Sequence, residues 1–346
     1  MDVSAFDFDL PPELIAQEPS ADPAAARLLH LRRDTGVFTH ETIAALPRLL
    51  RAGDLIVVND TRVFPARLLG RRVPSGGAVE CLLIARLDED RWDALMHPGL
   101  KLKPGARVIF DGPVAIHGEV LERRFFGRRV IRLWTDGNTS IEDAIEASGH
   151  IPLPPYIKRE DRTSDRERYQ TIFARASGSV AAPTAGLHFT PGLVASLKTA
   201  GVELVSITLH VGYGTFQPVR VARVEDHRIE PERYAITEET ADAVNTALDE
   251  RRRVIAVGTT TTRTLEGAAD SRGRLVAGAG ETGLFIYPGY TFRIVGGLLT
   301  NFHLPKSSLL MLASAFAGRE RLLAAYREAV ARRYRFYSYG DAMLIL

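Results

Sequence analysis

The chain has 346 residues, of which 45% are hydrophobic and 25% charged, and its formal net charge is +2. These values are ordinary for a soluble globular protein, and no apolar run is long enough to span a bilayer. The single cysteine, Cys81, excludes an internal disulfide and a cluster of thiolate metal ligands. We find no export signal and therefore expect a cytoplasmic protein, while the charge neither requires nor excludes a nucleic-acid partner.

Residues 1–66 end in a polar loop that directly follows an apolar strand. Short apolar patterns predict strands at 27–31 and 55–58, with a brief helix at 46–50 between them. The strand at 55–58 has four apolar residues in a row, which is typical of a strand covered on both faces. Ligands of α/β sheets bind at the carboxyl ends of strands. We therefore predict substrate contacts from Asn59, Asp60, Thr61 and Arg62.

Between residues 67 and 134 the pattern changes to short alternating runs separated by turns, with no helical period. This predicts a small antiparallel β-barrel or sandwich inserted as residues 67–150 into a main domain made of residues 1–66 and 151–346. One cluster in the insert fits an RNA-binding hairpin as well as a solvated basic tip. Its residues are Arg123, Arg124, Phe125, Phe126, Arg128 and Arg129.

Two connecting stretches follow the insert. A predicted helix at 141–148 leads into a proline-rich stretch, 150–157, which must be extended and which we interpret as the return linker. The charge-dense run at 158–168 predicts an exposed loop that is either solvated or faces RNA.

The central stretch, residues 181–219, predicts a turn, a helix, a strand and a second turn rich in glycine. The first turn contains Thr184 and ends at His188, and the second begins at His210. Glycine lets the backbone approach a ligand closely, and loops at the ends of elements often carry function. We therefore add the residues of the second turn to the predicted substrate contacts, namely Gly212, Gly214 and Thr215.

Strands and helices alternate in the last third of the chain. Apolar patterns predict helices at 238–250, 306–316 and 319–334, and strands at 253–257, 283–289 and 298–305. Such alternation indicates an α/β main domain with mostly parallel strands. The turn after the strand at 253–257 carries Thr259 and Thr260, whose hydroxyls would either bind an anion or a ribose or simply cap the helix.

Several familiar motifs are absent or out of context. Residues 278–283 have the G-x-G-x-x-G spelling, but they open an apolar, strand-like run instead of a helix, so we interpret them as a flexible turn. The sequence has no phosphate-binding P-loop and no nucleophile elbow. No histidine pair has zinc-ligand spacing, and we expect no metal.

Histidines stand out at the ends of predicted elements. His188, His210, His227 and His303 all occupy such positions, and loops of an α/β domain gather at one edge of the sheet. A single histidine of this kind is more often structural, but four favour a shared cleft. The residues alone leave an enzyme acting on a nucleotide or nucleic acid as the first hypothesis, with an RNA-binding module and a methyltransferase as alternatives.

Blocks along nearly the whole chain carry a resemblance to a known family. They include GDLIVVNDTRVFPARL, APTAGLHF, LHVGYGTFQPV, VIAVGTTTTRTLE and LTNFHLPKSSLLMLASAFAG. In this order they closely resemble the S-adenosylmethionine:tRNA ribosyltransferase-isomerase family of queuosine biosynthesis. The resemblance implies an α/β domain interrupted by a small β-barrel, with S-adenosylmethionine as substrate and no metal. The second substrate would be a tRNA with 7-aminomethyl-7-deazaguanine (preQ1) at the wobble position.

The implied reaction transfers and isomerises the ribosyl moiety of S-adenosylmethionine to make epoxyqueuosine-tRNA, and it releases adenine and methionine. Such chemistry needs an acid and a base. We nominate His188, His210 and His303, with Asp226 and Glu232 as alternative bases. Arg263 and Asn301 join the predicted substrate contacts, together with the threonines at 184, 259 and 260. Neither a membrane nor an obligate protein partner is expected.

One position departs from the pattern of the family. Many members have a second histidine three residues after the position of His227, where this chain has Glu230. An essential role for that position is therefore doubtful in this protein.

Overall fold

Strand β3 (Leu55–Asn59) lies inside a large sheet, between β12 (Glu203–Leu209) and β14 (Val254–Val257). All five of its residues are buried, as expected for an apolar strand covered on both faces. The computed structural model describes residues 1–216 and 219–346, and the side chains of Phe126, Thr215 and Phe216 lie outside the described part. The side chain of Thr215, one of the predicted substrate contacts, is thus among those not described.

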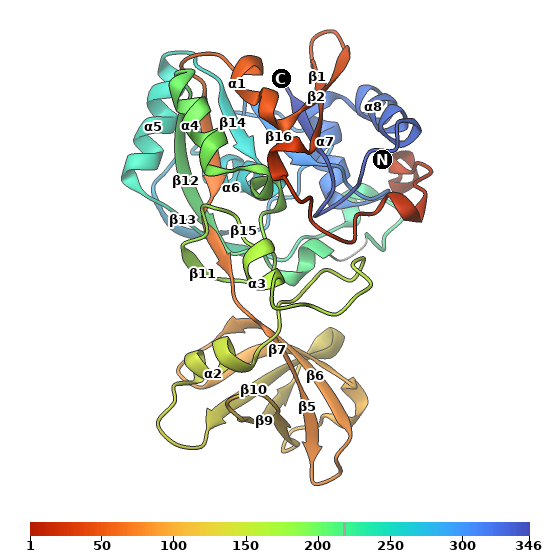
Figure 1. Ribbon diagram of the computed structural model, residues 1–346, viewed down its shortest axis with the longest axis vertical. Helices are drawn as coiled ribbons and strands as arrows, with labels where there is room; N and C mark the ends of the chain where they lie inside the picture. Colours follow the sequence, from red (N-terminus) through yellow and green to blue (C-terminus); the bar gives the residue numbers. More distant parts are fainter. Residues whose placement is uncertain (217–218) are drawn as a thin grey trace.

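Nine strands of the described chain form this sheet, drawn in the upper half of Figure 1. Their spatial order is β15 (Gly278–Thr282), β13 (Glu232–Ile236), β12, β3, β14, β16 (Gly297–Asn301), β17 (Ala342–Ile345), β1 (Arg27–Leu31) and β2 (Phe38–Thr42). A separate parallel pair, β4 (Thr61–Val63) and β11 (Ala176–Ser179), extends toward the second unit.

The expected mostly parallel pairing is not confirmed, because the sheet is mixed. Of the eight neighbouring pairs formed by its described strands, four are parallel and four antiparallel. Parallel pairing needs a crossover connection, usually a helix, and such helices serve the central strands. The outer strands are joined differently: β1 and β2 form a hairpin, and β13 pairs back on β12 through a connection whose described part has only the short 3-10 helices η8 (Tyr213–Phe216) and η9 (Val224–Asp226).

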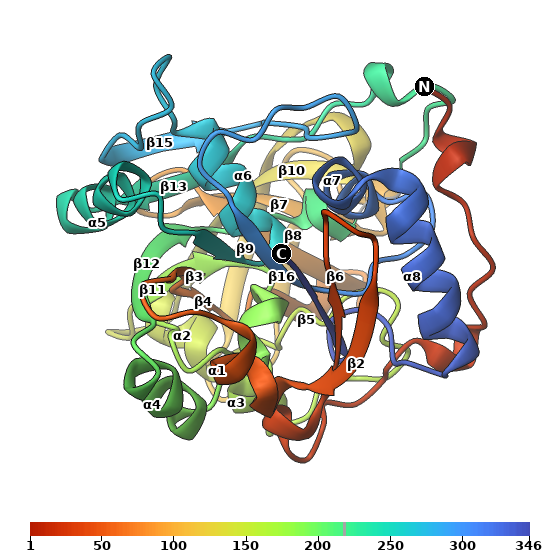
Figure 2. The same cartoon turned by 90° about the horizontal axis from the view of Figure 1, so that it is seen from above.

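Helices cover both faces of the sheet because alternate residues of each strand point to opposite sides. Leu55 and Val57 of β3 pack in one core, whereas Ile56 and Val58 pack in another. The two sets of helices lie on opposite sides in Figure 2. One side has α5 (Glu238–Asp249), α6 (Thr259–Gly267), α7 (Ser308–Ala317) and α8 (Arg319–Ala331), and the other has α1 (Leu46–Leu49) and α4 (Pro191–Thr199).

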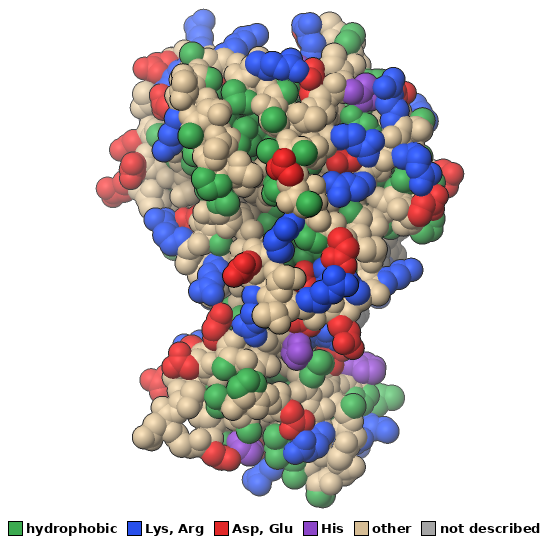
Figure 3. Space-filling model, in the orientation of Figure 1, with side chains coloured by type: hydrophobic (Ala, Val, Ile, Leu, Met, Phe, Trp, Pro, Cys, Tyr) green, Lys and Arg blue, Asp and Glu red, His purple; other side chains and the backbone are tan. Residues whose placement is uncertain are grey.

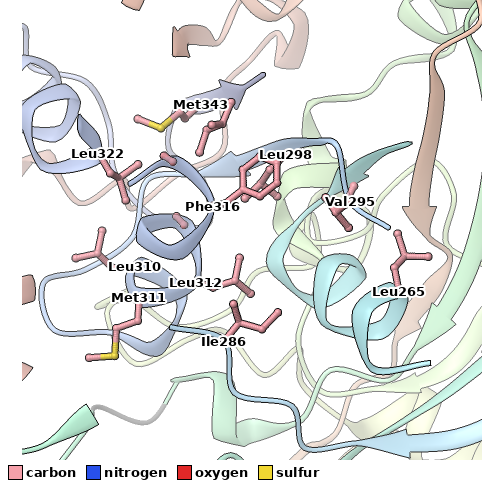
Figure 4. Close-up of a cluster of buried hydrophobic side chains, with 14 of the residues drawn as sticks. Leu265, Ile286, Val295, Leu298, Leu310, Met311, Leu312, Phe316, Leu322 and Met343 are labelled. Atoms are coloured by element: carbon pink, nitrogen blue, oxygen red, sulfur yellow. The ribbon is translucent and has the colours of Figure 1, made fainter. Parts of the chain in front are cut away.

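The larger core lies between α6 and α7, where the side chains interdigitate (Figure 4). Leu265 of α6, Leu312 and Phe316 of α7, and Leu298 of β16 are all at most 2% exposed. Burying an aliphatic or aromatic side chain of this size stabilises a fold by about 1.5–3 kcal/mol. This packing holds the first turn of α6 firmly at the end of β14.

The second unit is a closed barrel, drawn below the sheet in Figure 1, and every pairing in it is antiparallel. A small antiparallel barrel is thus confirmed. Helix α2 (Ile141–Ser148) packs against it. Its strands are β5 (Arg67–Val73), β6 (Ala78–Arg86), β7 (Arg91–His97), β8 (Arg107–Phe110), β9 (Ile116–Arg123) and β10 (Arg128–Thr135).

The chain enters the barrel at Arg67 and leaves it at His150, and these residues exchange two backbone hydrogen bonds of 3.1 and 2.8 Å. The barrel core includes Cys81, as expected for an inert thiol; burial raises its pKa above the usual range. Most arginines of the β9–β10 hairpin interact with other groups of the protein. Arg129 is 1% exposed and donates to the carbonyl of Leu102 at 2.9 Å.

The turn expected at 278–283 and the strand expected at 283–289 were wrong, whereas the charged run at 158–168 is mostly exposed, as expected, but is anchored at one residue. Residues 278–282 form the edge strand β15, not a flexible turn, and they pair with β13; the apolar run at 284–287 packs on the core without joining a ladder. The charged run at 158–168 is held by the ion pair of Arg159 with Asp165, whose side chains meet at 2.7 and 2.9 Å. Asp165 is 1% exposed, so this run, including α3 (Asp165–Arg168), is not simply solvated.

No helix in the described ranges, 1–216 and 219–346, combines the length and apolar character needed to cross a membrane.

Candidate active site

A pocket with about 520 Å³ of empty space opens at the carboxyl ends of β14 and β16. This figure includes open solvent, and the cavity proper is about 50 Å³. The carboxyl end of parallel strands is where α/β sheets bind ligands. The structure brings five of the predicted residues together on its wall. They are Thr184, Thr259, Thr260, Asn301 and His303.

The first turn of α6 faces this pocket without a side-chain cap. Gly258 is the N-cap residue, with φ +91°, a conformation that favours glycine. The hydroxyls of Thr261 and Thr262 bond backward to the carbonyls of Val257 and Gly258, at 2.7 and 3.1 Å. Those of Thr259 and Thr260 have no such partner within the described residues. The turn therefore offers hydroxyls and free backbone N–H groups to a ligand, which favours binding over simple capping.

Asn301, the last residue of β16, is held by two neighbours. Thr184, in the turn η7 (Thr184–His188), donates its hydroxyl to Oδ1 of Asn301 at 3.1 Å. The Nδ2 group of Asn301 in turn lies 3.2 Å from Nε2 of His188. Because the amide is fixed at both ends, its orientation on the pocket wall is defined.

His188 and His303 are both buried and uncharged near neutral pH. Burial lowers the pKa of His188 to about 4 and that of His303 to about 3. His303 lines the pocket, and its Nε2 lies 2.9 Å from the hydroxyl of Thr300. His188 instead lies behind Asn301 and lines a neighbouring cavity. Neither imidazole carries a proton to give as an imidazolium at pH 7.

His210 points away from this pocket, since consecutive residues at the end of β12 face opposite sides. Val211 lines the pocket, whereas His210 lines a second one toward the barrel. The Nδ1 atom of His210 lies 2.9 Å from the hydroxyl of Thr61, and its ring packs on Gly178. Burial, followed by the charge of Arg233, lowers its pKa. The three nominated histidines thus line three different pockets.

Glu232 and Arg263 form a buried ion pair next to the second turn. Their side chains are 5% and 3% exposed, and Glu232 also accepts a hydrogen bond of 2.8 Å from the backbone of Gly212. Two guanidinium nitrogens of Arg263, Nε and Nη1, are buried without a hydrogen-bond partner among the described residues. Glu232 therefore acts as an anchor for Arg263 and Gly212, and a role as free base does not fit this geometry.

Known proteins resemble the chain over its whole length. Residues 3–345 match the sequence model of a family described as "Queuosine biosynthesis protein". The chain belongs to this queuosine biosynthesis family. The S-adenosylmethionine:tRNA ribosyltransferase-isomerase of Geobacter metallireducens is 52% identical over 350 residues, and that of Desulfitobacterium hafniense is 50% identical over 346; each match covers 100% of both chains. The crystal structure of an S-adenosylmethionine tRNA ribosyltransferase from Thermotoga maritima is 39% identical, with a TM-score of 0.57, covering 99% of this chain and 100% of that one.

In this member of the queuosine biosynthesis family, the loop after β3 mainly supports the sheet. Asn59 extends the β3–β12 pairing, because its side chain bonds to the carbonyl and N–H of Leu209 at 2.9 and 3.0 Å. Asp60 is buried, and it accepts hydrogen bonds of 2.6 Å from both Thr208 and Arg175. The side chains predicted to contact substrate here are thus engaged by other residues of the protein. Arg62 pairs instead with Glu146 of α2, at 3.1 Å.

The remaining predicted residues lie outside the first pocket. Gly214 approaches Glu230, whose carboxylate pairs at 2.8 Å with Arg128 of the barrel. The carboxylate of Glu230 thus links the two units. Asp226 is exposed in the turn η9 (Val224–Asp226), where the backbone of Val224 bonds to Met1. No cluster of three or more acidic, histidine or cysteine side chains in the described chain is arranged to hold a metal ion.

Sequence reasoning missed the aromatic side of the pocket. Tyr156 of the return linker and Tyr337 near the chain end both line it, with ring centroids 3.8 Å apart at 84°. Burial raises the pKa of both phenols, so both stay protonated. Tyr337 has φ +74°, which is strained for a bulky residue, and the tyrosine-rich ending YRFYSYG was the available signal.

Proposed function

We propose that this protein transfers and isomerises the ribosyl moiety of S-adenosylmethionine onto preQ1 at the wobble position of tRNA. The products are epoxyqueuosine-tRNA, adenine and methionine. The observation that carries the proposal is identity of about half of all residues, over the full length, with relatives named for this activity. The tRNA substrate is consistent with a cytoplasmic protein, and no obligate protein partner is proposed.

The first pocket is the proposed site of S-adenosylmethionine. The free hydroxyls of Thr259 and Thr260 and the positive end of the α6 dipole suit ribose hydroxyls or the methionine carboxylate. Asn301 presents a fixed amide to the same space. Tyr156 and Tyr337 provide aromatic surface for a planar base. We propose no metal, because the sulfonium group of the substrate already supplies a leaving group.

The roles in proton transfer are assigned from the protonation state of each group. Removal of the C5′ proton beside the sulfonium needs a base, and adenine leaves more easily when a ring nitrogen is protonated. His303, which lines the pocket and is neutral, is the proposed base, and the protonated phenols of Tyr156 and Tyr337 are the proposed proton donors. His188, held behind Asn301, is a positioning residue in this scheme.

Two further parts of the molecule complete the proposal. Residues 67–150 form an inserted folding unit, and residues 1–66 with 151–346 form the other, in keeping with the paired entry and exit at Arg67 and His150.

Arg263, anchored by Glu232, contacts substrate from the side of the Gly212 turn. Buried N–H groups without an acceptor are costly, so a ligand that supplied one would bind there favourably.

The test is to incubate the protein with S-adenosylmethionine and tRNA carrying preQ1, and to measure adenine, methionine and the modified nucleoside by chromatography and mass spectrometry. We expect all three products, and none with tRNA that carries guanine at the wobble position. Methyl transfer to RNA without adenine would instead identify a methyltransferase. Tight RNA binding without either product would identify a binding module.

A further inference from the structure

A second pocket lies at the waist between the barrel and the sheet, where the molecule narrows in Figures 1 and 3. Its cavity volume is about 320 Å³. The barrel contributes Arg86 and Trp92, the segment that joins the units contributes Phe64, and the sheet side contributes Gly178, His210 and Arg233. Because both units supply its walls, the pocket exists only in the assembled molecule.

The barrel side of this pocket is aromatic. The rings of Phe64 and Trp92 lie 6.0 Å apart, tilted by 38°, and the guanidinium of Arg86 lies over Trp92 at 6.0 Å. The indole N–H of Trp92 is buried without an acceptor among the described residues, so packing alone orients the ring. Aromatic rings and arginine planes are the surfaces on which proteins stack unpaired RNA bases.

The charges around the pocket leave one cation unpaired. Arg86 pairs with Glu142, and Glu146 pairs with Arg62 at 3.1 Å. Arg233 is exposed and has no carboxylate partner within the described ranges of the chain. A free guanidinium beside an aromatic wall suits a nucleotide, because the base stacks while the phosphate pairs with the arginine.

Two consecutive residues of the chain line the two pockets. His210 lines the waist pocket and Val211 lines the proposed S-adenosylmethionine pocket. Ser179 of β11 holds this part of the backbone in place, because its hydroxyl accepts a hydrogen bond from the backbone N–H of Val211 at 2.8 Å. The two pockets thus lie on opposite sides of the same short stretch of backbone, so one RNA substrate that occupied both would wrap around it.

We propose that the waist pocket binds a second, unpaired nucleotide of the RNA substrate, with its base against Phe64 and Trp92 and its phosphate on Arg233. This inference rests on the proposed function for its choice of RNA. The site recognises a nucleotide that does not react, so it contributes to affinity for RNA and to placement of the reacting nucleotide.

The first experiment uses Trp92 as the reporter. The chain has two tryptophans, and Trp134 stacks on His117 of the barrel, away from the pocket residues. Trp134→Phe leaves Trp92 as the only indole without touching the pocket. A hairpin RNA with the sequence of a tRNA anticodon stem and loop should quench Trp92 emission saturably, whereas a loop-free duplex should not. Single abasic substitutions along the loop should abolish quenching at one position only.

The second experiment removes the cation. Arg233→Ala should weaken binding of the hairpin by about tenfold and lower the slope of log K against log salt by about one, the signature of one lost phosphate contact. Arg327→Ala is the matched control, because Arg327 is an exposed arginine on α8, which lies at the upper right of Figure 1, away from the barrel. Phe64→Leu should weaken binding by a similar factor without changing the salt slope.

The outcomes separate this proposal from the function on which it rests. If the wild type releases adenine but hairpin binding leaves Trp92 emission unchanged, the waist pocket is not a nucleotide site. The same conclusion follows if Arg233→Ala behaves like Arg327→Ala. If no adenine is released and the hairpin does not bind, the proposed function fails and the nucleotide site fails with it.

Discussion

Asn301 is hydrogen-bonded through Nδ2 to Nε2 of His188, 3.2 Å away, and through Oδ1 to the hydroxyl of Thr184. The histidine therefore supports a pocket residue from behind. We predict that Thr184→Val lowers adenine release by about tenfold, the equivalent of one net hydrogen bond of about 1.4 kcal/mol. Thr184→Ser keeps the hydroxyl and should retain most of the activity. Equal losses in both variants would show that the methyl group matters and the hydrogen bond does not.

The two buried imidazoles predict how stability depends on pH. The pKa of each is lowered from 6.5, to about 4 in His188 and about 3 in His303. Between pH 6.5 and these values the unfolded chain binds protons that the folded chain does not, so the free energy of unfolding falls as the pH falls. The slope is about 1.4 kcal/mol per pH unit for each histidine. Urea unfolding between about pH 7 and pH 5 measures it, and a flat profile in that window would contradict burial of both groups.

The Glu232–Arg263 pair predicts an asymmetric response to mutation. Glu232→Gln or Arg263→Met leaves a buried charge without its partner and should cost about 3–5 kcal/mol of stability. The double variant should cost clearly less than the sum, because no charge is then left behind. Chemical denaturation of the three variants measures the coupling. Additive losses would mean that the pair does not form.

A side chain at position 178 would test whether the position of His210 matters. A Cβ atom at this position would lie 2.9 Å from the imidazole, and the φ of +144° disfavours any side chain. Gly178→Ala should therefore displace His210 and reduce hairpin binding and adenine release at least fivefold. Gly192→Ala is the control, since its Cβ would meet only the Thr190 hydroxyl, at 4.0 Å, within α4. That variant should leave activity unchanged and raise stability by up to about 1 kcal/mol.

Replacing Glu230 should have only a small effect on stability and turnover, although the resemblance described above expects a histidine at this position. Its pair with Arg128 is half exposed, with side chains 50% and 29% accessible, and such pairs contribute at most about 1 kcal/mol. Glu230→His should change the midpoint of thermal unfolding by only a few degrees and leave adenine release within twofold. A large gain in turnover would instead give the lost histidine a chemical role.

Local patterns in the sequence determined much of this protein. The apolar run of β3, the alternating runs of the barrel and the threonines after β14 are short-range signals, and each corresponds to an element or surface of the structure. The many blocks in a fixed order also identify the family from the sequence alone.

Only the tertiary structure decided which side chains meet. Whether His210 or Val211 faces the first pocket depends on the register of β12 with its neighbouring strands. A shift of one residue would turn His210 toward the pocket and Val211 away from it. Tyr156 and Tyr337 are 181 positions apart in the numbering, yet their rings touch. The waist pocket is built from both units, and the mixed pairing of the outer strands depends on how the connections pack. Contacts between distant segments follow from the packing of the whole chain, and no local pattern records them.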